Sequence, residues 1–349
     1  MKNISLQSIL VLIFLFFAQG IFASDNKHPE SELEPFDANE FIMDHIADAH
    51  DFHILTLPNG KHISVPLPVI LYSRQSGFHV FMSSQLAHGH IHHGLELVIE
   101  GEYKGKIIEH NEQGEIIIPL DFSITRNVFS MMLSALIILW LFISLGRSYS
   151  KIGISEPKGL QGFLEPLVLF VRDDIAKVII GEKKYEKFMP YLLTAFFFIW
   201  INNLIGIIPF FPFGSNVTGN IAVTLVLALF TFFVTQINAN KSYWKHIVAM
   251  PGVPVWLSPI MIPIEIIGLF SKPFALMVRL FANITAGHII ILTLISLIFI
   301  FKSLMVAPAS IAFVLFMDVI ELLVAVLQAY VFTLLSALFI GLAVQEESH

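Results

Sequence analysis

The chain has 349 residues, of which 56% are hydrophobic and only 13% are charged, with a net charge of −7 and a mean hydropathy of +0.76. Soluble proteins carry about 25% charged residues, so this composition excludes an ordinary soluble domain. Several apolar runs reach the roughly 20 residues that a helix needs to cross a bilayer, which indicates a polytopic membrane protein. The chain has no cysteine, which excludes disulfides, thiol catalysis and cysteine-bound metals.

Residues 1–24 have the pattern of a secretory signal peptide. Lys2 supplies the positively charged n-region, residues 9–17 form the short apolar h-region, and residues 18–24 contain the small residues typical of a cleavage site. A first transmembrane helix is the alternative, and the short apolar core favours the signal peptide. We therefore expect the mature chain to begin outside the cytoplasm.

Residues 25–121 are predicted to form an acidic, His-rich accessory domain in the periplasm. This segment holds 16 Asp or Glu and 5 Lys or Arg, so its formal net charge is −11, whereas the remainder of the chain has a net charge of +4. One short helix is expected within residues 38–53, and Asn59-Gly60 between apolar runs predicts a hairpin. A second hairpin is expected to turn near residues 112–114. The pattern predicts a small, mostly β extramembranous domain, and nothing in it suggests a nucleic acid partner.

The stretch "AHGHIHHGLE" in this domain contains a candidate metal site. His88, His90 and His92 alternate, so on a strand they would share one face and could bind zinc or copper. A solvated polar loop is the alternative, favoured because no fourth ligand can be identified. A proton-collecting role near a channel mouth is a third interpretation.

Residues 122–349 are predicted to form an all-α membrane domain. About five transmembrane helices are expected, near residues 124–146, 187–209, 218–238, 256–301 and 305–345. Residues 160–184 combine apolar residues with charged residues, a composition that predicts one amphipathic helix at the membrane interface rather than a span. Basic residues at 147–158 and 241–245 favour cytoplasmic loops, with the C-terminus on the same side.

The last two predicted helices are unusually long. About 40 residues correspond to ~60 Å, twice the hydrocarbon thickness, so we expect strong tilt. Two long tilted helices would present a broad face to another membrane component.

These two helices carry ionisable and amide side chains at membrane depth, where such groups usually mark an ion path or a paired site. Arg279 and Asn283 lie four residues apart on one face, and Glu265 lies about 21 Å earlier on roughly the same side. His288 lies about half a turn out of phase with Arg279. In the last helix, Glu321 and Gln328 share a stripe, with Asp318 one turn before.

This arrangement suits two proton routes that stop short of each other. Carboxylates and imidazole take up and release protons, whereas arginine stays charged and favours the ionised form of a nearby carboxyl. Arg279 facing a mobile carboxyl on a partner would make it release its proton. A structural ion pair of Arg279 with Glu321 or Asp318 is the alternative, and a packing role is the alternative for His288.

The segments "SKPFALMVRLFANITAGHIIIL" and "LLVAVLQAYVFTLLSALFIGLA" resemble the C-terminal helices of subunit a, the stator ion-channel subunit of rotary F-type ATP synthases. "NNLIGIIPF" and "TGNIAVTLVLAL" are similar to the preceding spans of that family. The resemblance covers about residues 124–345 and does not extend to residues 1–121.

The resemblance implies a role for each matched position. Arg279 corresponds to the arginine that faces the c-ring carboxylate, Asn283 to the asparagine one turn later, and Gln328 to the glutamine beside the arginine. Glu265 corresponds to the acidic residue of the cytoplasmic half-channel. His288 and Glu321 correspond to an exchanged Glu/His pair of the outer half-channel, and Asp318 joins them here only because it shares a face with Glu321.

The resemblance implies a non-catalytic, proton-translocating subunit in the bacterial inner membrane, without cofactor, that contacts the c-ring and the b subunits of the peripheral stalk. In agreement, the chain lacks a P-loop pattern for ATP. A self-contained proton-coupled secondary transporter is the alternative, but it would usually show two related halves. An intramembrane metalloprotease would need clustered ligands such as H-E-x-x-H, which the spans lack.

Overall fold

The structure is a computed structural model. It describes residues 37–56, 62–99, 101–110, 115–152, 158–208, 211–248, 255–301, 303 and 305–345. Ala38–His349 form one compact unit, and the account below concerns that unit. The expected signal peptide at residues 1–24 lies outside the described residues.

The N-terminal region of the unit is rich in β-structure, as predicted. The helix α2 (Ala38–Ile46) comes first, in the segment where a short helix was expected. Eight strands follow, and the 3-10 helix η1 (Ser83–Gly89) lies between the fourth and the fifth. The strands are β1 (Asp51–Thr56), β2 (His62–Pro66), β3 (Pro68–Ser73), β4 (Gly77–Met82), β5 (Leu95–Leu97), β6 (Ile107–His110), β7 (Ile116–Ile117) and β8 (Leu120–Asp121).

These strands form three small antiparallel sheets within the described residues. β1 pairs with β2, β3 lies between β4 and β8, and β6 lies between β5 and β7. Both predicted hairpin pairings, β1 with β2 and β6 with β7, are confirmed, while their turns lie outside the described residues.

The core of the β region is small and apolar. Alternation along β3 directs Val69 and Leu71 inward, and both have no exposed area. They pack with Phe81 from β4, Leu86 from η1 and, from the third sheet, Leu95 and Ile107.

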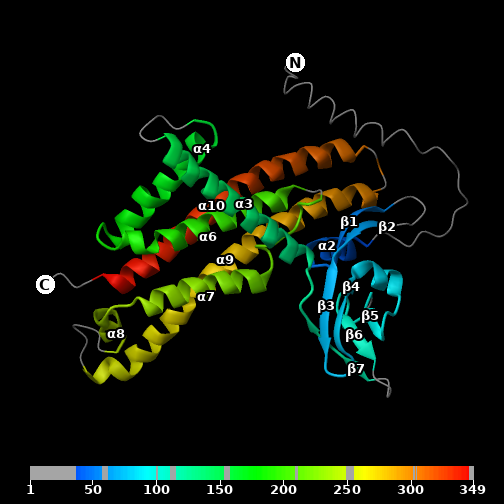
Figure 1. Ribbon diagram of the computed structural model, residues 1–349, viewed down its shortest axis with the longest axis horizontal. Coiled ribbons are helices and arrows are strands. Elements are labelled where there is room, and N and C mark those ends of the chain that lie inside the picture. Colours follow the sequence, from blue (N-terminus) through cyan, green and yellow to red (C-terminus); the bar gives the residue numbers. More distant parts are fainter. Residues whose placement is uncertain are drawn as a thin grey trace, which may run out of the picture. The chain divides into compact units, whose positions relative to one another are not determined.

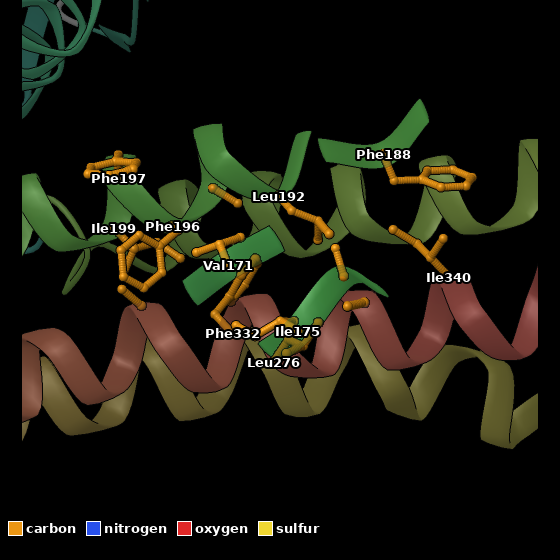
Figure 2. Close-up of a cluster of buried hydrophobic side chains, with 14 of the residues drawn as sticks. Val171, Ile175, Phe188, Leu192, Phe196, Phe197, Ile199, Leu276, Phe332 and Ile340 are labelled. Carbon is orange, nitrogen blue, oxygen red and sulfur yellow. The ribbon is translucent and has the colours of Figure 1, made fainter. Parts of the chain in front are cut away.

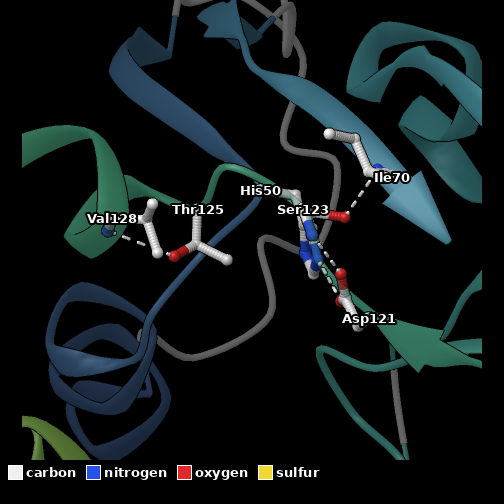
Figure 3. Close-up of polar contacts among 6 residues, drawn as sticks. All are labelled: His50, Ile70, Asp121, Ser123, Thr125 and Val128. Atoms are coloured by element: carbon white, nitrogen blue, oxygen red, sulfur yellow. Dashed lines mark hydrogen bonds and ion pairs between the residues drawn. The ribbon is translucent and has the colours of Figure 1, made fainter. Parts of the chain in front are cut away.

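Polar contacts are concentrated where the β region meets the first membrane helix, α3 (Arg126–Ile152); Figure 3 shows those of His50, Asp121 and Ser123. The buried imidazole of His50 lies 2.8 Å from the Asp121 carboxylate, and Ser123 Oγ accepts a hydrogen bond from Ile70 N. The pKa of Asp121 is lowered: burial raises it, but hydrogen bonds from His50 and Ser123 outweigh that effect. The guanidinium of Arg126 donates to the carbonyls of His45 and Ala47.

The rest of the unit is helical (Figure 1). After α3 come α4 (Leu160–Phe170), the π-helix η2 (Val171–Lys177), α5 (Val178–Ile180), α6 (Tyr185–Ile207), α7 (Ile221–Ile237), α8 (Lys241–Val248), the 3-10 helix η3 (Val255–Leu257), α9 (Ser258–Phe301) and α10 (Ala307–Val344). Among the described residues, α3, α6, α9 and α10 are each long and apolar enough to cross a membrane. The span expected at 218–238 corresponds to α7, which meets that criterion only together with α8, across a bend of 101°.

The membrane helices pack around a cluster of large apolar side chains (Figure 2). Phe196, Leu192 and Ile199 of α6 meet Phe332 and Ile340 of α10 in this cluster. Each of these residues is at most 3% exposed. The α6–α10 pair therefore forms the packed centre of the domain.

The segment expected as an interfacial helix, residues 160–184, is one helical stretch from α4 through η2 to α5, and it ends at Gly181 with φ of 98°. Val171, Ile175 and Ile180 are buried in the same apolar cluster. Gly341 of α10 allows close approach, because a Cβ there would lie 2.7 Å from the Ile179 carbonyl oxygen. One face of this stretch is thus packed against the membrane helices.

Candidate functional site

His288 of α9 and Glu321 of α10 are in direct contact. His288 Nδ1 lies 2.6 Å from Glu321 Oε1, and their side chains are 17% and 6% exposed. A carboxylate with so little contact with solvent is stable only with a strong hydrogen-bond partner. The two residues, 33 positions apart in sequence, therefore form one acid–imidazole pair with little exposure to solvent.

Two glycines make room for this pair. A Cβ on Gly287 would lie 3.0 Å from Glu321 Oε1, and a Cβ on Gly206 would lie 3.7 Å from His288 Nε2. The same Gly206 Cβ would lie 3.2 Å from the Ser215 carbonyl oxygen. Glycine at these positions therefore allows α6, α9 and the loop before α7 to approach the acid–imidazole pair.

The pair lines a small pocket between α6, α9, α10 and the loop before α7. Polar side chains from α6 and the loop before α7 complete its lining; these residues are Asn202, Asn203, Ser215, Asn216 and Thr218. Thr218 donates to Asn203 Oδ1 at 2.5 Å, whereas Asn202 Oδ1 and both polar side-chain atoms of Asn216 have no hydrogen-bond partner within the described chain. Buried polar atoms of this kind usually bind water.

Sequence reasoning did not identify these amides and hydroxyls as site residues. The signal was present, because "INN" places two amides inside an apolar span and "GSNVTGN" is a polar loop without charge. Such residues also cap helices and form turns, as Asn220 does when it accepts from Ala222 N. Only the fold shows which of these polar residues line the pocket and which cap a helix or form a turn.

Arg279 points away from the His288–Glu321 pair. Its side chain is exposed, as is that of Asn283 one turn later, while Leu276, Leu280 and Ile284 cover the buried side of α9. Within the described residues Arg279 makes no ion pair or hydrogen bond. An ion pair of Arg279 with Glu321 or Asp318 is therefore not present among the described side chains.

The surface around Arg279 has little steric bulk. Ala275, Ala282 and Ala286 are all exposed on α9 near the arginine. Small residues allow another helix to come close within a membrane. Arg279 thus lies on a surface where a partner helix can approach its guanidinium.

The other predicted site residues occupy both long helices. Glu265 is half-buried near the start of α9, and Asp318 is half-buried one turn before Glu321. Gln328 is buried on α10, at 4% exposure. Lys272 lies over the ring of Phe339 at 5.8 Å and lines a second pocket, together with Gln236 and Tyr243.

The histidine-rich segment does not form the single strand on which a metal site could be built. His88 lies in η1, His90 follows this 3-10 helix, and His92 makes an isolated bridge with Leu95. The alternation of His88, His90 and His92 therefore does not place them on one strand face. Among the described side chains, no three His, Asp or Glu residues are positioned to hold a metal ion.

Comparison with known proteins matches two parts of the chain. The family model of the ATP synthase A chain matches residues 128–341, which include α9, all but the last three residues of α10, and every residue of the pocket. A domain of unknown function, DUF8433, matches residues 41–122, which correspond to the β region.

Curated relatives cover about two thirds of the chain. ATP synthase subunit a of Chloroherpeton thalassium is 51% identical over 235 residues, which are 66% of this chain and 69% of that protein. Subunit a of Chlorobium phaeobacteroides is 53% identical over 236 residues, covering 66% and 68% of the two chains. Subunit a 2 of Prosthecochloris aestuarii is 49% identical over 249 residues, covering 68% and 75%.

Proposed function

This chain belongs to the family of subunit a of F-type ATP synthase, a multi-pass membrane component of the F0 sector, and we propose that it forms two offset proton half-channels that meet a c-ring. The observation that supports this proposal best is the opposite orientation of two ionisable side chains on α9. Arg279 is exposed and without a partner in the described chain, whereas His288 is turned inward to Glu321.

The outer half-channel, in this proposal, is the polar pocket around His288 and Glu321. A proton entering through the amides and hydroxyls of the pocket reaches a carboxylate and an imidazole, both of which can bind and release it. Asp318, one turn from Glu321, extends the acidic lining. From this pair the proton passes to a carboxyl on the partner ring.

Arg279 acts where the ring carboxyl returns. A guanidinium remains charged at every biological pH, and hydrocarbon is an unfavourable environment for it unless an anion is near. A ring carboxyl that arrives there is stabilised in its ionised form and releases its proton. Asn283 and Gln328 flank the arginine from α9 and α10, and Glu265 receives the proton on the cytoplasmic side.

The same proposal assigns the sides of the membrane and the domains. Residues 1–24 are a signal peptide, residues 25–121 a periplasmic accessory domain, and residues 122–349 the channel domain in the bacterial inner membrane, with a cytoplasmic C-terminus. The basic segments 147–158 and 241–245 support this orientation. The stretch α4–η2–α5 then lies at the cytoplasmic interface, and the b subunits of the peripheral stalk hold the chain against rotation.

Replacement of the arginine tests the proposal. In assembled ATP synthase, Arg279→Ala removes the charge that discharges the ring carboxyl, so we expect proton-driven ATP synthesis to fall to background. Thr293→Ala is the matched control, because Thr293 is also exposed on α9 and its hydroxyl bonds only to the Ile289 carbonyl of its own helix. Normal coupled synthesis by an assembled Arg279→Ala complex would refute the proposal.

A further inference from the structure

The sheet formed by β4, β3 and β8 has large apolar residues on both faces. Its inner face contains Val69, Leu71 and Phe81, which belong to the core. A sheet that covers a core on one side usually has polar residues on the other. Here the outer face is also apolar; its residues are Ile70, Tyr72, Phe78, Val80, Met82, Leu120 and Phe122.

The strand register shows that these side chains form one continuous surface. Tyr72 is paired with Phe78 on one side and with Leu120 on the other, and Ile70 is paired with Val80. Residues paired across antiparallel strands point to the same face. Phe122 N donates to the Ile70 carbonyl, so Phe122 continues the row from β8. We call these seven residues the outer sheet face.

The outer sheet face is highly exposed. Phe78 is 66% exposed, Val80 61% and Phe122 63%. None of the seven residues carries a charge. A contiguous apolar surface of this kind marks an interaction site rather than a solvated surface.

The chain holds this face close to the membrane. Only three residues separate Phe122 from Arg126, where the span α3 begins, so the two Cα atoms lie at most about 14 Å apart. Hydrogen bonds of Arg126 to the carbonyls of His45 and Ala47, and of Asn127 N to Asp48 Oδ1, fix the β region to the first turn of α3. The outer sheet face is therefore continuous in sequence with a lipid-spanning segment.

From these observations we propose that the outer sheet face lies in the interfacial layer of the lipid bilayer and anchors the β region to the membrane surface. Phenylalanine, leucine, valine and methionine supply apolar area, and Tyr72 supplies a ring that favours the headgroup level. The segment of residues 25–121 has a balance of −11, so anionic lipid does not attract it. The contact is hydrophobic, and it is insensitive to salt and to the fraction of anionic lipid.

The absence of cysteine in the chain allows a direct test. Val80→Cys places a single thiol on the outer sheet face, and Glu102→Cys places one on an exposed turn of the same β region as the matched control. Each variant is assembled into the complete ATP synthase, labelled with a nitroxide and reconstituted into vesicles of phosphatidylethanolamine and phosphatidylglycerol. The unsubstituted complex, labelled in the same way, gives the background from other subunits.

Spin-label accessibility separates the outcomes. The quantity compared is the accessibility of the label to oxygen divided by its accessibility to a water-soluble nickel complex. We expect this ratio to be several-fold higher at position 80 than at position 102. At position 80 it should fall when detergent replaces lipid. Equal ratios at the two positions would overturn the proposal, because the face would then be in water. If the label at position 80 had low accessibility to both reagents, in lipid and in detergent alike, the proposal would also be overturned. The outer sheet face would then be covered by protein, either another subunit or residues 1–36. None of these outcomes depends on proton transport, so the half-channel proposal stands or falls separately.

Discussion

Replacement of Gly287 by alanine is expected to weaken the His288–Glu321 pair while leaving both residues in place. The added Cβ would lie 3.0 Å from Glu321 Oε1, whereas ordinary van der Waals contact begins near 3.4 Å. The carboxyl must therefore retreat by about 0.4 Å. Because the Glu321 carboxyl is only 6% exposed and bonds to His288 through this same oxygen, the movement is transmitted to that hydrogen bond.

The geometry gives the size of the effect. If the carboxyl retreats along its bond to His288, the N···O distance lengthens from 2.6 Å to about 3.0 Å, from a short charge-assisted bond to an ordinary one. The difference between the two classes is about 1 kcal/mol, which corresponds to about a fivefold change. We therefore expect passive proton flux through the membrane sector to fall about fivefold.

The assay compares two glycine substitutions on one helix. Gly268→Ala is the matched control, since a Cβ there would meet no atom within 4 Å. Both substitutions gain about 0.5–1 kcal/mol of helix propensity, so that contribution cancels. Proton flux is measured by dye quenching in vesicles that carry the membrane sector without the catalytic head. Equal flux in the Gly287→Ala and Gly268→Ala complexes would refute the reasoning that the pair limits entry.

Two further changes test other contacts. The double variant His288→Glu with Glu321→His keeps an acid and an imidazole in contact, so we expect it to retain more ATP-driven proton pumping than either single variant; equal loss in all three would argue against a shared route. In the β region, the lowered pKa of Asp121 means that its bond to His50 stabilises the fold above the ordinary carboxyl value of 3.8 and is lost as the pH falls below it. The hydrogen-exchange protection factors of residues 116–125 should therefore fall on acidification, and Asp121→Asn should remove this acid dependence; an unchanged profile of protection factors in the variant would contradict the assignment.

Much of the membrane architecture follows from the sequence alone, because bilayer thickness imposes a length on each span. The expected helices at 256–301 and 305–345 correspond to Ser258–Phe301 and Ala307–Val344. The two hairpins were also predictable, since alternation and turn residues are local signals. For the histidine segment the sequence left two interpretations open, a metal site on a strand and the favoured polar loop, because alternating histidines do not distinguish an extended chain from the 3-10 turn at Ser83–Gly89.

Residue types and helical spacing determined which groups could carry protons: Arg279, His288 and Glu321 are identifiable as unusual charges in apolar helices. Only the tertiary structure decided which of them meet. His288 and Glu321 come together because Gly287 and Gly206 let three segments approach, whereas Arg279 is left exposed by the packing of Leu276, Leu280 and Ile284. The physical reason is that helical periodicity fixes directions around one helix axis, while contact between helices depends on side-chain volume at their crossing points. The exposed apolar face of the β4–β3–β8 sheet likewise depends on strand register, which hydrogen bonding between distant segments decides.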